Sequence, residues 1–76
     1  MQENYQQLAA ALHERITIIA DEASRRDEAH HMARLQTISE TIERLGHSLP
    51  EPVNPQLRHF LQRRSYSKAL ELLETP

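Results

Sequence analysis

Cysteine is absent from this chain of 76 residues, and glycine and phenylalanine occur once each. Without cysteine, disulfides, thiolate zinc sites and cysteine nucleophiles are excluded. Phosphate-cradling loops and nucleophile elbows need residues that tolerate positive φ, and Gly46 is the single glycine present. Nucleotide-binding loops of the glycine-rich type are therefore excluded.

Long hydrophobic runs are also absent. No stretch approaches the ~18 consecutive apolar residues that indicate a transmembrane helix, and residues 1–7 lack the basic and apolar regions of a secretory signal. Hydrophobic residues make up 38% and charged residues 26% of the chain, which is typical of a water-soluble helical domain. These features predict a cytoplasmic protein that is not inserted in a membrane.

The length predicts one domain that spans residues 1–76. A domain of this size buries only about 60% of the surface that its unfolded chain exposes. Contact with a second copy or with another protein is a natural source of further burial. We therefore expect a homo-oligomer, in the simplest case a dimer, or association with another protein.

Apolar residues at steps of three or four predict a first helix over residues 4–23. We assign the charged side chains of Glu14 and Arg15 to its remaining, solvated faces. The apolar stripe that is expected to form the core consists of Tyr5, Leu8, Leu12, Ile16 and Ile19.

The same spacing predicts a second helix over residues 26–45, with Gly46 interpreted as its C-terminal cap. Residues 24–27 match a capping box, which places the start of this helix near Arg26. Its stripe consists of Met32, Leu35, Ile38, Ile42 and Leu45.

One continuous helix is the rival interpretation, because neither proline nor glycine separates the two stripes. At about 100° per residue the stripes point roughly 120° apart, so a straight rod would bury neither completely. A tight turn between two antiparallel helices is therefore preferred.

Pro50 and Pro52 predict a connector over residues 47–53. A short helix is expected over 55–63, because Asn54 is a good N-cap that precedes a proline, and another is expected over 66–74. The predicted fold is all-α: an antiparallel helical hairpin with two short C-terminal helices packed back on it, a small helical bundle.

Residues 65–74 resemble one half of a tetratricopeptide unit. The resemblance lies in the spacing of Tyr66, Ala69, Leu70 and Leu73. The period of about 34 residues that defines this repeat is missing from the rest of the chain, so no repeat architecture is predicted.

Five histidines suggest a metal site, and Glu28 and His31 have the Glu-x-x-His spacing of carboxylate-bridged di-iron bundles. Such a site needs a second motif, which is missing, so a histidine-dependent metal-binding bundle is the weakest hypothesis and no cofactor is predicted. Nothing in the order of Ser, His and Asp marks a nucleophile with its base. We predict no catalytic residue and no enzymatic activity.

Charge is distributed unevenly, because residues 1–51 carry five basic and nine acidic side chains whereas residues 52–70 carry four basic and none acidic. Residues 52–70 are called the cationic segment below. It contains the residues predicted to contact a partner or an anion, namely Arg58, His59, Arg63, Arg64 and Lys68.

Three interpretations of this segment are open: internal pairing with the acidic hairpin, an acidic protein partner, or a nucleic acid. Internal pairing is preferred, and the net charge of −2 counts against nonspecific binding to nucleic acid. The expected internal partners are Glu14, Asp21, Glu22, Glu40 and Glu43.

Four apolar residues fit none of the stripes and are predicted to form an exposed patch for self-association. They are Ala11, Ile18, Leu49 and Leu72. The predicted function is a small helical protein–protein interaction module or accessory subunit that self-associates. The alternative is a regulatory protein whose cationic C-terminal segment contacts nucleic acid.

Overall fold

The computed structural model describes residues 3–74, which form five helices and no strand. The all-α prediction is confirmed for this part of the chain. None of these helices is both long and apolar enough to cross a lipid bilayer. The helices are α1 (Glu3–Ala20), α2 (Glu22–Arg26), α3 (Glu28–His47), α4 (Pro55–Gln62) and α5 (Tyr66–Glu74).

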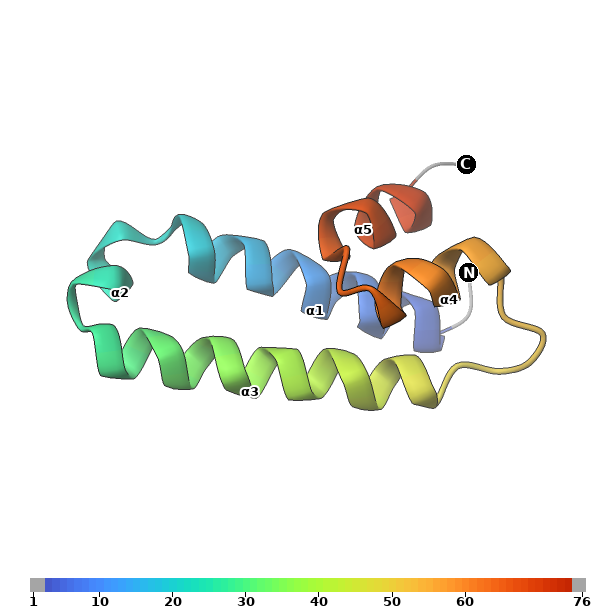
Figure 1. Cartoon of the computed structure of the whole chain (residues 1–76), viewed down its shortest axis with the longest axis horizontal. Helices are drawn as coiled ribbons and strands as arrows, with labels where there is room; N and C mark the ends of the chain where they lie inside the picture. The colour runs from blue at the N-terminus through green and yellow to red at the C-terminus, as the bar shows by residue number, and fades with distance from the viewer. Residues whose placement is uncertain (1–2, 75–76) are drawn as a thin grey trace.

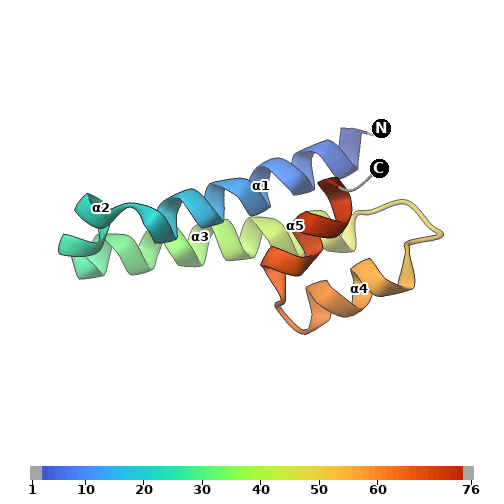
Figure 2. The ribbon, with the colours of Figure 1, turned by 90° about the horizontal axis from the view of Figure 1, so that it is seen from above.

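The two longest helices, α1 and α3, lie side by side and are joined at one end by α2 (Figures 1 and 2). At the other end, α5 contacts α1, and α4 contacts both α3 and α5. We call α1 and α3 the helical pair, and residues 16–36, where neither α4 nor α5 lies over the pair, its open half (Figure 2). The rest of the pair is its covered half.

The core lies mainly in the covered half. Its fully buried large side chains are Leu8, Leu12, Ile42 and Leu57, and α5 adds Tyr66, Ala69 and Leu70. Burial of one such leucine or isoleucine contributes about 1.5–3 kcal/mol to the free energy of unfolding. The two short helices are therefore held by the side chains that they bury against the helical pair.

The turn between the long helices differs from the prediction, because it contains the short helix α2. Asp21 caps α2 by accepting from the Ser24 N–H at 3.2 Å, and Asp27 caps α3 by accepting from the His30 N–H at 3.1 Å. The predicted capping box is wrong, because Ser24 does not cap a helix. A carboxylate is favoured at a helix N-terminus, and the two aspartates take both cap positions.

Gly46 is not the cap of the second long helix. Helix α3 continues to His47, and the N–H of Ser48 donates to the carbonyls of Arg44 and Leu45, both at 3.2 Å. A Cβ atom on Gly46 would lie 3.4 Å from Cδ1 of Leu61. This is an ordinary van der Waals distance, so α4 packs directly beside this position of α3.

The two short helices begin where they were expected. Asn54 Oδ1 accepts from the Gln56 N–H at 2.8 Å, and Pro55 occupies the first helical position. Between α4 and α5, Arg64 adopts a positive φ of 57°. The Ser65 N–H donates to the Phe60 carbonyl at 2.8 Å, which ends α4 in the manner of a Schellman motif.

Candidate functional site

The five predicted contact residues of the cationic segment are all exposed, but two of them have carboxylate partners. Arg58 Nη2 donates to Glu51 Oε1 at 2.7 Å, and Arg64 Nη2 donates to Glu43 Oε1 at 3.4 Å. Of the acidic residues expected to face the segment, Glu43 does so.

In the described part of the chain, the other three predicted contact residues have no carboxylate partner. The His59 ring lies 6.2 Å from the Phe60 ring, centroid to centroid. The side chains of Arg63 and Lys68 form no hydrogen bond or ion pair within residues 3–74. The segment thus combines internally paired cations with free ones.

Both ion pairs lie in the wall of a cavity of about 340 Å³ between the C-terminal part of α3, the connector and α4. We call it the α3–α4 cavity. The apolar part of its wall consists of Ile42, Leu49, Val53, Leu61 and Tyr66. Reasoning from the sequence identified the two arginines but missed the cavity, because its wall comes from segments that are separate in the sequence.

The two ion pairs of the cavity are open to solvent. The side chains of Arg58 and Glu51 are 50% and 74% exposed, and those of Arg64 and Glu43 are 70% and 56% exposed. An exposed pair typically stabilises a protein by about 0–1 kcal/mol. Little free energy therefore holds these charges to each other, and they remain available to a ligand.

The four residues predicted to form an exposed self-association patch do not form one. Ala11, Ile18 and Leu49 are buried within the single chain, and Leu72 is half-buried. The expectation of an exposed patch is wrong for the three buried residues. Helix α1 contacts α2 and α3 as well as α5, so residues outside its main stripe are covered in both halves.

Three members of the predicted core stripes are exposed instead. Ile16 is 38%, Ile19 40% and Met32 60% exposed. All three belong to the open half of the helical pair, where no third element covers them. Three residues that were expected in the core are thus exposed, and three that were expected in an exposed patch are buried.

The part of α1 that α5 covers ends near Arg15. Its guanidinium carbon lies 4.9 Å from the centre of the Tyr66 ring of α5, and its Nε is buried without a hydrogen-bond partner in residues 3–74. This arginine is half-buried, not on a solvated face as expected from the sequence. Ile19 follows Arg15 by four residues and therefore lies on the same face of α1.

A shallow groove of about 640 Å³ follows the exposed face of α3. Small or flexible side chains line most of it, including Ala29, Met32, Ala33 and Ser39, and it ends at Glu43 and Arg64. Small side chains allow another helix to approach α3 closely.

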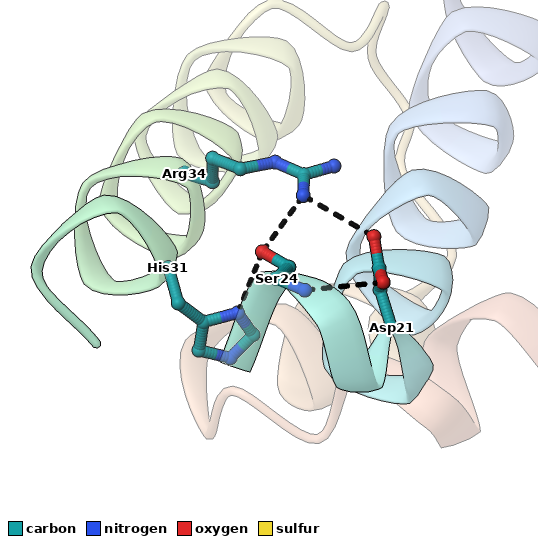
Figure 3. A network of polar contacts seen from close by, with 4 residues as sticks. All are labelled: Asp21, Ser24, His31 and Arg34. Carbon is teal, nitrogen blue, oxygen red and sulfur yellow. Dashed lines mark hydrogen bonds and ion pairs between the residues drawn. The ribbon is translucent and has the colours of Figure 1, made fainter. Parts of the chain in front are cut away.

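A polar network holds the turn between the long helices (Figure 3). Arg34 Nη1 donates to Ser24 Oγ at 2.8 Å and to Asp21 Oδ2 at 3.5 Å. Ser24 Oγ also lies 3.1 Å from Nδ1 of His31. The hydrogen bond from the Ser24 backbone N–H, together with Arg34, lowers the pKa of Asp21 below its usual value. The network therefore joins α2 to the start of α3.

This network contains Ser, His and Asp but not the relay of a hydrolase. Asp21 contacts Arg34 and the Ser24 backbone, whereas a catalytic aspartate orients the histidine. Ser24 is buried and lies in the wall of neither the α3–α4 cavity nor the α3 groove. The geometry is that of a structural clasp.

The histidines that suggested a metal site lie beside this clasp. His31 contacts Ser24, and the backbone N–H of His30 contributes to the cap of α3. Within residues 3–74, no three His, Asp or Glu side chains gather closely enough to hold a metal ion. Independence from metal stays a prediction.

Comparison with known proteins returned no match among family models, curated proteins or solved structures. No relative therefore supplies a function for this chain. Its open half and its α3–α4 cavity are the two surfaces from which a function is inferred.

Proposed function

We propose that this chain is a self-associating protein–protein interaction module and that a second copy covers its open half. The framework is the expected antiparallel hairpin with two short helices packed back on it. The observation that carries the proposal is the exposure of Ile16, Ile19 and Met32 in the half of the helical pair that lacks a third element.

Continuity with the covered half supports this surface. On α1, Ile19 continues the row of Arg15, which contacts α5. On α3, Met32 and Ser39 belong to the row of Glu43, which pairs with Arg64 after α4. Each row continues into the open half a face of the helical pair that α4 or α5 covers in the covered half. Two further helices could therefore pack on the open half in the same layer as α4 and α5.

The charge of the open half favours a second copy as the occupant. Residues 16–36 carry four acidic and three basic side chains. In a two-fold symmetric dimer, the same patch of each copy faces that of the other. A nearly neutral patch that carries acidic and basic side chains can therefore pair its acidic groups with the basic groups of the second copy. A strongly charged partner gains no comparable attraction. Two helical pairs joined in this way form a four-helix arrangement.

The proposed role is that of a scaffold or accessory subunit without enzymatic activity. Contact with nucleic acid is a weaker candidate, because Arg58 and Arg64 already pair with carboxylates. Arg63 and Lys68 alone provide few phosphate contacts, and phosphate contacts supply most of nonspecific affinity.

Analytical ultracentrifugation of the 76-residue chain over a wide concentration range tests the proposal. We expect a reversible dimer, and we expect Ile19→Glu to shift it to monomer, because a charge on this surface opposes burial. Ala10→Glu is the matched control: Ala10 is exposed and lies nine residues before Ile19, on the opposite face of α1.

Circular dichroism verifies that each variant stays helical. Met32→Glu provides a second test at a side chain that is 60% exposed and therefore contributes little to the fold of a single chain. A wild-type chain that stays monomeric at every concentration would contradict the proposal. Dimers of Ile19→Glu and Met32→Glu as stable as the wild-type dimer would contradict it too.

A further inference from the structure

We propose that the α3–α4 cavity is a binding site for a small zwitterion with an apolar side chain, of the class of the apolar α-amino acids. The cavity lies outside the open half, and Glu43 and Arg64 form the boundary between it and the α3 groove. Its size, its apolar wall and its two ion pairs carry the inference.

The cavity is large enough for a small molecule. Its volume of about 340 Å³ lies at the lower end of the range of roughly 300–1,000 Å³ found for small-molecule sites. Gly46 forms part of the cavity wall and has no side chain that would occupy the cavity. Small, single-residue ligands therefore match the site better than extended ones.

The apolar wall selects the side chain of the ligand. Ile42 and Leu49 are buried residues of the core that also line the cavity, and Val53, Leu61 and Tyr66 complete this surface. Val53 and Leu61 are half-buried, so an aliphatic or aromatic side chain displaces water chiefly from these two on binding, which is favourable. A purely polar ligand gains nothing from them.

The charges of the wall select a zwitterion. Two guanidinium groups and two carboxylates balance one another, so a multiply charged anion meets Glu43 and Glu51, and a cation meets Arg58 and Arg64. A ligand that carries one ammonium and one carboxylate satisfies both kinds of group. Each guanidinium has five N–H donors, of which a single carboxylate uses only some.

The pair of Arg64 and Glu43 is the one that receives the charged groups of the ligand. Its contact is 3.4 Å, against 2.7 Å between Arg58 and Glu51, so it is the weaker of the two. The ligand carboxylate accepts from Arg64, and its ammonium donates to Glu43. Glu43 belongs to α3 and Arg64 to the turn after α4.

Titration of the ¹⁵N-labelled 76-residue chain with leucine, phenylalanine and methionine, followed by NMR, tests the site. We expect saturable shifts confined to residues of the cavity wall. Leucine is compared with 4-methylpentanoate, which lacks the ammonium, and with 3-methylbutylamine, which lacks the carboxylate. Each should bind about tenfold to a hundredfold more weakly, because one charge-assisted contact is lost.

Arg64→Gln and Glu43→Gln should each weaken leucine binding by about tenfold or more. Arg63→Gln and Glu40→Gln are matched controls, since these neighbours do not line the cavity, and they should leave binding unchanged. Absence of saturable shifts with all three amino acids would overturn the proposal. Equal binding of leucine and its one-charge analogues, or unchanged binding by both cavity variants, would overturn it as well.

Discussion

The covered and open halves of the helical pair carry the same kind of apolar row but bury it to different extents. On α1, Leu8 and Leu12 are 0% exposed beneath α5, whereas Ile16 and Ile19, one turn and two turns further along, are 38% and 40% exposed. The difference between the halves is the presence of α4 and α5 (Figure 1). An apolar row at helical spacing therefore indicates a face that suits packing, and a third element decides whether that face is core or surface.

The largest expected effect compares one residue from each half. Leu12→Ala should lower the free energy of unfolding by about 2–5 kcal/mol, because it leaves a cavity in a packed region. Ile19→Ala should lower it by less than about 1 kcal/mol in the single chain, since its side chain is already partly in water. Urea denaturation at low protein concentration, where the chain is monomeric, measures both.

If Leu12→Ala and Ile19→Ala lowered the free energy of unfolding equally at low protein concentration, the proposed difference in burial between the two halves would be contradicted. A loss for Ile19→Ala that grows with protein concentration would instead add weight to a second copy on the open half, because dimer stability depends on concentration.

A second prediction concerns the clasp at the end of the open half. Asp21→Ala should lower the melting temperature by a few degrees, because the cap of α2 is lost. Glu22→Ala, at an exposed neighbour, is the control and should change little. Thermal denaturation followed by circular dichroism compares them. If both variants melt alike, the clasp does not stabilise the end of the pair that lacks a third element.

The charge of Asp21 adds a pH dependence to the open half. The pKa of Asp21 is lowered in the folded chain, so its ionised form contributes stability that is fully present above the unfolded pKa of about 3.9 and is lost as the pH falls through the folded value. Asp21→Asn keeps a good cap but removes the charge.

The melting temperatures of wild type and Asp21→Asn should therefore differ at pH 7 and converge toward pH 2. A difference that stays constant over this range would show that the carboxylate charge is not responsible.

The smallest effect is expected in the cationic segment, which includes α4 and the start of α5. Replacing Arg58, Arg63, Arg64 and Lys68 with Gln removes two exposed ion pairs, which together stabilise the chain by about 0–2 kcal/mol. Urea denaturation measures this loss, which should be smaller than that of Leu12→Ala.

The same fourfold variant tests whether the cationic segment binds nucleic acid. Wild-type binding to DNA or RNA below micromolar at physiological salt, with a steep salt dependence that the variant loses, would favour the nucleic-acid alternative. We expect neither.

Local signals in the sequence determined the helices. Asn54 and Pro55 begin α4 where a cap and a proline predict it, and the apolar stripes locate both long helices to within a few residues, apart from the turn. Such signals depend on residues a few positions apart, and hydrogen bonds and steric limits within one turn of helix are enough to establish them. Arg58 and Arg64 were singled out from the uneven distribution of charge along the sequence, and their role in binding stays a prediction.

Only the tertiary structure decided which apolar residues are core. Ala11 and Ile18 lie outside the main stripe but are buried, because α1 meets α2, α3 and α5, whereas Ile19 lies on a face of the open half that α5 does not reach. The α3–α4 cavity likewise joins Glu43 to Arg64 across a separation of 21 residues. Burial depends on what lies opposite a side chain, and that neighbour comes from a distant part of the chain whose position no local pattern specifies.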